Sequence, residues 1–364
     1  MADIVGKDNV LTSPYDLDRY SADALHPFRV YSTTNLADQI AQVVVRPAST
    51  DEVAKIVTLA NSQKIPLVPY GGGTGVMGGT VPIQGGIIVD VSRMNQVLEI
   101  NPTDLTARVE AGVVLADLVD ALAEHSLMPG HDPYSVPIAT VAGTISTNGV
   151  GYRAAAFGPM GNQVVALEVV LPDGRIVSTN AVPKYSSGPN LNHLFIGSEG
   201  VFGVITRATI QVYRLPEARI FNAVDFDSFD QGFLGAAELL ALGIRPTLLD
   251  LSEDEEGIRL HLLFEGFKEG AAAQDQRSLK VLAAMAGMAA LLACSPQTQA
   301  GASSEPAGAQ APAPEAAVHP VSGLAVVPLT VTSGEDRHQF AVEVADTREA
   351  QARGLMFRPE LGDF

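Results

Sequence analysis

The sequence is short of residues on which several classes of protein depend. It has a single cysteine, Cys294, so no disulfide can form within its 364 residues. Lysine and arginine number 23 against 41 aspartate and glutamate residues. The resulting net charge of −18 argues against a nucleic-acid partner, which requires a basic surface. The seven histidines lack the paired spacing of a metal site, so we expect no metal.

The start of the chain has no long apolar run. The first 30 residues contain none, which predicts that no signal peptide is present and that this part of the protein is cytoplasmic. Hydrophobic residues at 46% and charged residues at 18% describe a globular chain that can bury a core. The length is enough for two or three domains of ordinary size.

Glycine is concentrated between residues 65 and 92. Eight glycines fall from Gly71 to Gly86, between two apolar runs. A strand that breaks into Gly-Gly-Gly-Thr-Gly exposes consecutive backbone N–H groups, and such a nest binds anions. The stretch has no Lys or Arg, so backbone amides would hold a phosphate here. On this stretch alone, a glycine-rich loop without a ligand is an equal alternative.

The spelling Gly73-x-Gly75-x-x-Gly78 matches the dinucleotide fingerprint only in part. That fingerprint requires a helix directly after the third glycine. Residues 79–82 read Gly-Thr-Val-Pro instead and lead into another strand-like run. A nicotinamide-binding Rossmann site is therefore disfavoured, and no Gly-Lys-Ser/Thr sequence indicates a P-loop.

Two further segments combine glycines with small or polar residues. Residues 130–151 read GHDPYSVPIATVAGTISTNGVG, which suits a second cradle of backbone and hydroxyl groups. Residues 194–206 read LFIGSEGVFGVIT and lead into a strand predicted at 204–212. Taken alone, the first segment is a polar loop, and Glu199 in the second is a solvated turn carboxylate.

Strands and helices are expected around these segments. A strand at 42–45 precedes a helix whose start is marked by the capping box of Ser49 and Glu52. Strands are predicted at 97–100 and 105–110, helices at 115–125 and 233–241, and alternating strands over 221–270. The turn Pro172-Asp173-Gly174 predicts a hairpin that joins residues 163–171 to 175–178.

In this order, the segments resemble the FAD-binding region of the vanillyl-alcohol oxidase/p-cresol methylhydroxylase flavoproteins. That family includes D-lactate dehydrogenases, the glycolate oxidase flavin subunit and alkylglycerone-phosphate synthases. The resemblance covers residues 44–217 and extends weakly to 270. It rests on VPYGGGTGVMGG, on GHDPYS followed by Thr140, Gly143 and Thr147, on VVALEVVLPDG and on LFIGSEGVFGVIT. It implies an α+β fold with a two-lobed FAD-binding domain that holds FAD between its lobes.

The resemblance also implies which residues contact FAD. Residues 69–76 would wrap the pyrophosphate, Asp132 with two hydroxyl residues would follow the ribityl chain, residues 146–149 would line the flavin, and residues 199–205 would close over the adenine. The expected cofactor-binding residues are Pro69, Tyr70, Gly71, Gly72, Gly73, Thr74, Gly75, Val76, Asp132, Ser135, Thr140, Gly143, Ser146, Thr147, Gly149, Gly161, Glu199, Gly200, Val204 and Ile205.

Covalent attachment of the flavin is not expected. Relatives that tether FAD place a His after the loop glycines, where this chain has Thr74-Gly75, or use a Cys that is absent here. The resemblance assigns the general base and the carboxylate-binding arginine to the substrate domain, so we name no catalytic residue. His131 and Lys184 are the titratable residues beside the cradles, and each is interpreted as structural or solvated.

The activity implied is transfer of a hydride from a 2-hydroxy acid, such as D-lactate or glycolate, to non-covalent FAD. The substrate is a small molecule, and the electron acceptor is not identified. An alkylglycerone-phosphate-synthase-like activity is the alternative, since GHDPYS and LHLLFEGFKEG resemble those synthases. Asn148 and Asp250 stand where the synthases carry arginines, which argues against a phosphate-lipid substrate. A catalytically inactive FAD-binding fragment in a chimeric chain is the third possibility.

The character of the sequence changes after Gln276. Residues 277–294, RSLKVLAAMAGMAALLAC, have the basic start, short apolar core and Leu-Leu-Ala-Cys ending of a bacterial lipoprotein signal, and the apolar core is too short to span a membrane. An ordinary buried helix is the alternative. Residues 295–320 are rich in Pro and Ala and are expected to be disordered. Residues 321–364 resemble the start of a small exported bacterial domain.

The predicted organisation therefore has six parts. They are an N-terminal segment (1–37), the FAD-binding domain (38–217), a truncated start of the substrate or cap domain (218–276), the lipoprotein-signal-like segment (277–294), the linker (295–320) and a partial, β-rich exported domain (321–364). We interpret the junction near residue 276 as artefactual or engineered. Contact with a membrane is expected only if the segment that ends at Cys294 is processed as a lipoprotein signal.

Overall fold

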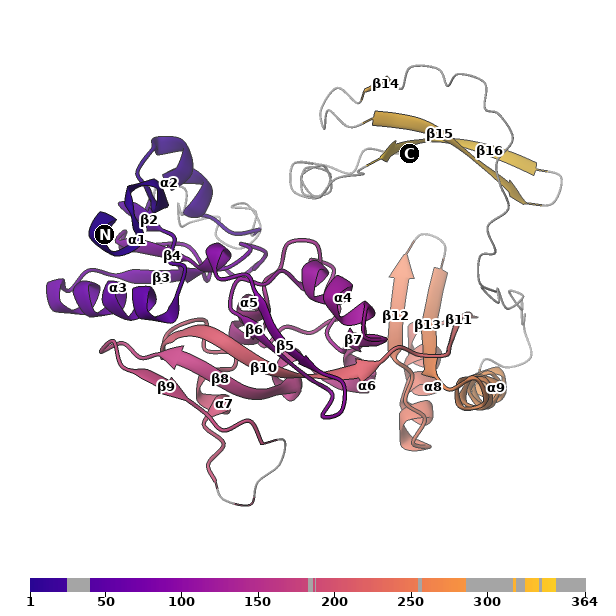
Figure 1. The fold of residues 1–364 in the computed structure, drawn as a ribbon. Helices are drawn as coiled ribbons and strands as arrows, with labels where there is room; N and C mark the ends of the chain where they lie inside the picture. The colour runs from indigo at the N-terminus through magenta and orange to yellow at the C-terminus, as the bar shows by residue number, and fades with distance from the viewer. Residues whose placement is uncertain are drawn as a thin grey trace. The chain divides into compact units, whose positions relative to one another are not determined.

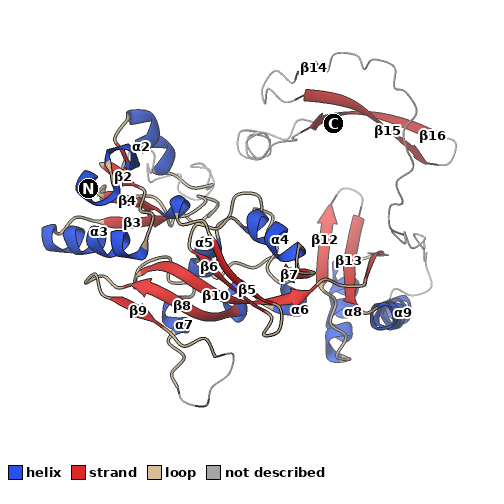
Figure 2. Cartoon of the chain, viewed as in Figure 1, coloured by secondary structure: helices blue, strands red, loops and turns tan. Residues whose placement is uncertain are grey.

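The computed structural model describes residues 1–24, 40–182, 186, 188–254, 257–285, 317–318, 325–333 and 336–344. The chain divides into two compact units, Met1–Pro296 and Gln297–Phe364. The described part of the first unit is a mixture of helices and strands (Figures 1 and 2). Lys184, Cys294 and the linker at 295–316 lie outside the described residues.

The first lobe is built on a small sheet with the strand order β1-β2-β4-β3. The strands β2 (Val43–Val45), β4 (Ile87–Asp90) and β3 (Leu67–Tyr70) are parallel, and β1 (Val10–Leu11) pairs with β2 in the antiparallel sense. The helix α3 (Thr50–Gln63) buries Ile56 and Ala60 against this sheet. It begins at the predicted cap, where the Glu52 N–H donates to Ser49 Oγ at 3.2 Å. The N-terminal helices are α1 (Ala2–Val5) and α2 (Pro14–Tyr20).

The second lobe is an antiparallel sheet with the strand order β5-β6-β10-β8-β9, and β7 pairs with β10. Its strands are β5 (Val97–Asn101), β6 (Thr106–Glu110), β7 (Leu127–Pro129), β8 (Val164–Val170), β9 (Ile176–Ser178) and β10 (Val204–Arg214). The helices α4 (Leu115–Ala123) and α5 (Val141–Ser146) contribute Leu118 and Ile145 to its core. Two short helices, α6 (Ala154–Phe157) and α7 (Asn192–Phe195), complete this part.

A smaller layer of strands and helices follows, which we call the cap. Its antiparallel sheet has the order β11-β13-β12, with β11 (Ala218–Phe226), β12 (Leu248–Asp254) and β13 (Gly257–Gly266). The helices α8 (Phe229–Ala241) and α9 (Lys268–Met285) pack on one face of this sheet through a core that includes Phe226, Leu239 and Phe264.

The helix α9 runs without interruption through residue 276, where the sequence predicts a boundary. Ser278 and Leu282 lie beyond that boundary, and both are fully buried in the cap. This packing supports the alternative interpretation, a buried helix, for residues 277–285. No helix among the described residues is both long and apolar enough to cross a bilayer.

The expected elements lie close to observed ones, although α1, β1, α2, β7, α6 and α7 were not expected. Two expected segments also differ from the structure. The segment 130–151, interpreted as a cradle or a polar loop, contains α5. Thr140 caps this helix, since the Gly143 N–H donates to Thr140 Oγ1 at 3.2 Å. The helix expected at 233–241 begins earlier, at Phe229, because Ser228 caps it through the Gln231 N–H at 3.3 Å. In the second unit, the described residues form the antiparallel strands β14 (Ala317–Val318), β15 (Ala325–Ser333) and β16 (Asp336–Val344).

Candidate cofactor site

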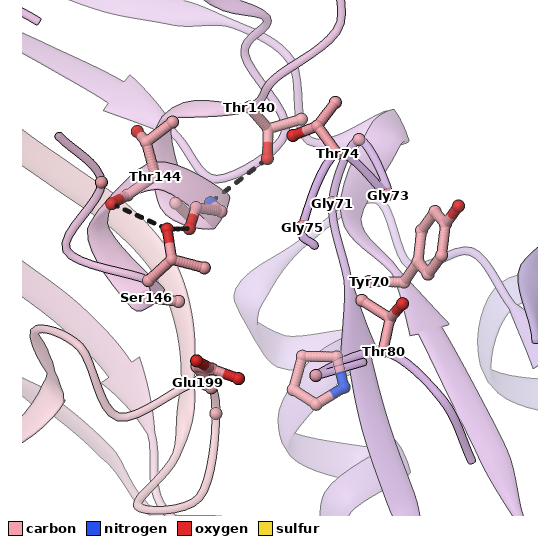
Figure 3. Close-up of a pocket in the computed structure, with 18 of the residues that line it drawn as sticks. Tyr70, Gly71, Gly73, Thr74, Gly75, Thr80, Thr140, Thr144, Ser146 and Glu199 are labelled. Atoms are coloured by element: carbon pink, nitrogen blue, oxygen red, sulfur yellow. Dashed lines mark hydrogen bonds between the residues drawn. The ribbon is translucent and has the colours of Figure 1, made fainter. Parts of the chain in front are cut away.

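A cavity of about 390 Å³ lies where the three glycine-containing segments meet. This volume is within the range of about 300–1,000 Å³ that is usual for small-molecule sites. The first segment follows β3, the second includes α5, and the third leads into β10. Figure 3 shows Gly71, Gly73 and Gly75 on one side of this cavity and Ser146 and Glu199 on the other.

The glycine loop after β3 lies too close to the second segment to carry side chains. A Cβ added at Gly71 would stand 2.4 Å from Thr140 Oγ1, and one at Gly72 would stand 2.3 Å from the carbonyl oxygen of Ile138. Among the described residues, the N–H groups of residues 72–76 donate no hydrogen bond. Backbone N–H groups need an acceptor, so this row of donors can receive an anionic ligand.

The second segment presents backbone and hydroxyl groups from α5 and its flanks. The Thr144 and Thr147 hydroxyls donate to the carbonyl oxygens of Val141 and Gly143 at 2.9 and 3.1 Å. These internal hydrogen bonds hold the short helix in shape, so its exposed backbone keeps a fixed position beside the cavity.

The third segment is tied to both of the others. The Glu199 N–H donates to the carbonyl oxygen of Ser146 at 2.9 Å, which fixes the third segment to the second. Gly200 has a φ of 83°, and a Cβ there would stand 2.6 Å from Cγ of Pro69 in the first segment. Glycine is therefore needed at Gly200 for both its conformation and its close approach to Pro69.

The structure brings together eighteen of the twenty residues that the sequence analysis assigned to the cofactor. They line the cavity and are Pro69, Tyr70, Gly71, Gly72, Gly73, Thr74, Gly75, Val76, Ser135, Thr140, Gly143, Ser146, Thr147, Gly149, Glu199, Gly200, Val204 and Ile205. Their shared cavity agrees with the expectation of one ligand site, and their contact with FAD stays a prediction.

Asp132 and Gly161 do not line the cavity. The Asp132 carboxylate accepts the Arg153 backbone N–H at 2.8 Å and forms an ion pair with the Arg153 guanidinium at 3.4 Å. Burial raises the pKa of Asp132, and the arginine opposes this shift. Gly161 instead donates its N–H to Asn148 Oδ1 at 2.9 Å. Both residues hold loops together beside the site.

Several lining residues were not assigned to the cofactor from the sequence. Met77, Gly79 and Thr80 continue the glycine loop, so their place follows from their neighbours. Asp23 comes from the N-terminal segment and accepts the Gly78 N–H at 2.9 Å, a contact across 55 positions that no local pattern signals. The remaining ones are Val91, His131, Pro133, Ala142, Thr144, Val150 and Gly203.

The cavity has little positive charge of its own. None of the described residues that line it is a lysine or an arginine. Burial lowers the pKa of His131 to about 4, so its ring is neutral at pH 7. Burial also raises the pKa of Tyr70 to about 12, helped by the nearby carboxylate of Asp90. An anionic ligand would therefore be bound by the dipoles of backbone N–H groups. The described residues contain no group of three side chains that could hold a metal ion.

Comparison with known proteins identifies this region. Residues 41–180 match the sequence family described as FAD binding domain. This region of the chain is therefore similar to an FAD-binding domain. It begins at β2 and ends after β9, and it includes the glycine loop and α5.

Curated relatives extend the similarity beyond the domain. The glycolate oxidase subunit GlcD of Bacillus subtilis is 34% identical over 221 residues, which is 60% of this chain and 47% of the relative. A D-lactate dehydrogenase of Archaeoglobus fulgidus is 39% identical over 213 residues, 58% of this chain and 47% of the relative. An alkyldihydroxyacetonephosphate synthase of Trypanosoma brucei brucei is 33% identical over 226 residues, 61% of this chain and 36% of the relative. This chain spans about half the length of the first two.

Solved structures show the same fold at low sequence identity. An alkyldihydroxyacetonephosphate synthase aligns with a TM-score of 0.68 and 21% identity, covering 77% of this chain and 57% of that one. A p-cresol methylhydroxylase aligns with a TM-score of 0.66 and 21% identity, covering 78% and 63%. The expected α+β fold of the vanillyl-alcohol oxidase/p-cresol methylhydroxylase type is thus confirmed for the first unit.

The residues of the cavity fit FAD. The diphosphate of FAD can be bound by backbone N–H groups that donate no hydrogen bond within the protein, at a place where no side chain blocks its approach. The glycine loop meets both conditions. The hydroxyl-rich second segment, with Ser135 and Thr140, offers neutral polar groups to the polyol chain and rings. FAD is accordingly the cofactor of this domain.

Proposed function

We propose that the chain is the flavin-binding part of an oxidoreductase that takes a hydride from a 2-hydroxy acid such as D-lactate or glycolate. The observation that carries the proposal is the cavity at which the three glycine-containing segments meet. The substrate class comes from the relatives named D-lactate dehydrogenase and glycolate oxidase. The electron acceptor that would regenerate the enzyme is left open by this proposal.

The protein's own contribution is to bind and orient FAD, which would supply the hydride acceptor when bound. The N–H groups of the glycine loop bind the diphosphate, and the close contact between Gly200 and Pro69 closes the third segment over the first. The cap continues from β10 through β11 and would carry part of the surface that meets the substrate. We assign no general base to the described residues.

We propose that the FAD is held without a covalent bond. The position after the loop glycines is occupied by Thr74 and Gly75, and neither can form the histidyl bond of the tethered relatives. Acid precipitation of the purified protein is expected to release the yellow colour into the supernatant. Flavin that remains with the precipitate would contradict this part of the proposal.

A second candidate activity is that of an alkylglycerone-phosphate synthase. The relative from Trypanosoma brucei brucei favours it, since its similarity covers much the same part of the chain. Two observations weigh against it. Asn148 carries no charge, and its side-chain oxygen is engaged by the Gly161 N–H. The described lining has no cationic side chain for a substrate phosphate.

One experiment separates these candidates. The purified chain is loaded with FAD, made anaerobic, and mixed in turn with D-lactate, L-lactate and glycolate while its visible absorption is followed. Loss of the flavin absorption with D-lactate or glycolate supports the proposal. In a second assay the protein is given an acylated glycerone phosphate and a long-chain alcohol. Release of the acyl group as a carboxylic acid and attachment of the alkyl group, with no net reduction, would support the synthase. A loaded protein that does neither is an FAD-binding chain without catalytic activity.

A further inference from the structure

His131 is a buried polar residue without a visible reason for its burial. It is 2% exposed, and both of its ring nitrogens are buried without a hydrogen-bond partner among the described residues. Buried polar side chains nearly always have a partner, so each exception requires an explanation. The ring lines the cofactor cavity, which offers one.

The ring lies against the loop that follows α5. A Cβ placed on Gly149 would stand 3.2 Å from Nε2 of His131, so the imidazole packs directly on the Gly149 backbone. Both residues line the cavity. The nitrogens therefore lie in the wall of the site, beside residues 146–149, which are expected to line the flavin.

The residue that follows His131 is fixed by its own hydrogen bonds. The carbonyl oxygen and the carboxylate of Asp132 accept hydrogen bonds from the N–H groups of Tyr152 and Arg153 at 3.2 and 2.8 Å. The Arg153 guanidinium also reaches Glu265 of β13 at 3.0 Å. Arg153 thus connects the residue after His131 to the cap.

The ring is chemically suited to a hydrogen bond with an uncharged group. Burial keeps it neutral, so one nitrogen is a donor and the other an acceptor. The charged groups next to it, Asp132 and Arg153, are paired with each other and leave the imidazole free for another partner. The isoalloxazine ring of a flavin carries both carbonyl oxygens and ring nitrogens on its edge.

We propose that His131 is a cofactor-contacting residue whose neutral imidazole forms a hydrogen bond with the isoalloxazine ring of bound FAD. This inference rests on the proposed function, because it places the reacting ring of the flavin beside Gly149, where residues 146–149 are expected to line it. The bond satisfies a ring nitrogen that has no partner in the described chain. It also gives the protein a means of tuning the flavin's reduction potential, since it acts differently on the oxidised and reduced rings.

Gln163 is the competing partner. Its amide is fully buried, both of its polar atoms lack partners, and its Oε1 lies 3.0 Å from the position of a Cβ on Gly130, the residue before His131. A hydrogen bond between His131 and Gln163, formed without FAD, would remove the reason for the proposal. The experiment therefore has to distinguish a hydrogen bond between His131 and Gln163, present before FAD is added, from one between His131 and FAD that forms when FAD binds.

The test compares His131→Phe, which removes both nitrogens, with His131→Asn, which keeps a donor and an acceptor. The exposed His125 supplies the matched control, His125→Phe. We expect His131→Phe to weaken FAD binding about tenfold, as for loss of one buried hydrogen bond, and to shift the visible bands and midpoint potential of the bound flavin. His131→Asn should recover part of each change, and His125→Phe should cause none. Identical affinity, spectrum and potential in His131→Phe would overturn the proposal.

A measurement on the unaltered chain covers the case in which His131→Phe does not fold. The ring-nitrogen NMR signals of His131, assigned by their loss in His131→Asn, are recorded before and after FAD is added. A shift on loading supports a bond to the cofactor, whereas unchanged signals point to Gln163 and overturn it. A protein that binds FAD with this shift, but is not reduced by any 2-hydroxy acid, would contradict the proposed function alone. Failure of the chain to bind FAD would overturn both.

Discussion

Arg153 and Glu265 connect the second lobe to the cap through an ion pair that is almost fully shielded from water. Arg153 Nε lies 3.0 Å from Glu265 Oε2, and the two side chains are 17% and 3% exposed. Glu265 also pairs with Arg219 of β11 at 2.7 Å. Glu265 is thus a buried carboxylate with two arginine partners, and without it Arg153 would keep only Asp132. The position of the cap therefore depends on this pair.

We expect Glu265→Ala to lower the free energy of unfolding by about 2 kcal/mol, because the shielded Arg153 loses a charged hydrogen-bond partner, while the half-exposed Arg219 can turn to water. Urea unfolding of the purified chain measures the change. The control is Glu99→Ala, whose partner Arg108 lies 3.5 Å away and where both side chains are about half exposed. An exposed pair of this kind contributes less than about 1 kcal/mol. If Glu265→Ala and Glu99→Ala lower the free energy of unfolding equally, the ion pair between Arg153 and Glu265 does not stabilise the protein more than an exposed pair does.

The cofactor loop should be intolerant of any side chain at Gly72. Gly72→Ala would place a Cβ 2.3 Å from the carbonyl oxygen of Ile138, and backbone cannot move aside as a side chain can. Overpacking of this kind costs about 1–3 kcal/mol, so we expect FAD to bind about tenfold to hundredfold more weakly. Titration of the apoprotein with FAD, followed by the quenching of flavin fluorescence, measures this.

Gly270→Ala is the matched control, since Gly270 lies in α9 with no atom within 4 Å of the added Cβ. It should bind FAD as the unaltered chain does and stabilise the helix by up to about 1 kcal/mol. A Gly72→Ala protein with the same FAD affinity as Gly270→Ala would mean that the loop does not bind the cofactor.

Most of this site could be predicted from the sequence because its chemistry is backbone chemistry. Runs of glycine and small hydroxyl residues are continuous in the chain, so residues 69–76 and 143–149 could be recognised before their partners were known. Asp132, which was expected to contact FAD, does not line the cavity, and its contacts could not be predicted from the sequence. Its role depends on Arg153, which lies 21 positions away, and on a cap residue still farther along the chain. Ion pairs between distant segments leave no local pattern.

The buried, neutral His131 should make the protein less stable in mild acid. Its pKa is about 4 in the folded chain and near 6.5 when exposed. Between these values the unfolded chain binds a proton that the folded chain does not, so stability is complete above about pH 6.5 and falls as the pH drops toward 4. The loss is at most about 3 kcal/mol, and less to the extent that water reaches the ring.

His131→Asn should remove this contribution. Unfolding of the apoprotein at pH 7 and at pH 4.5 gives the acid sensitivity of each protein, and the difference between the two proteins isolates the histidine. Carboxylates and the other histidines contribute equally to both proteins and cancel. A variant that is as acid-sensitive as the unaltered chain would show that the imidazole is protonated in the folded state.

The end of the cap shows where sequence patterns are ambiguous. Residues 277–285 have the basic start and apolar character of a signal segment, yet they also complete α9. Ala271, Ser278 and Leu282 recur at spacings of seven and four and form the buried side of that helix. Helical spacing of this kind favours a packed helix. The abrupt change in composition after Gln276 instead favoured a signal segment in the sequence analysis. The residues from 286 to Cys294 lie outside the described part of the chain.

Leu282 provides the test of which interpretation holds for the described residues. Its side chain is fully buried in the cap core, against Gly235 of α8, where an added Cβ would stand 2.9 Å from Leu282 Cδ2. We expect Leu282→Ala to destabilise the protein by about 3 kcal/mol through loss of buried surface and the cavity that remains. Met285→Ala, one turn later and 37% exposed, is the control and should cost much less. Urea unfolding of both variants measures the difference. If Leu282→Ala costs no more than Met285→Ala, residues 277–285 are not part of the cap core, and the signal-segment interpretation then extends back to Arg277.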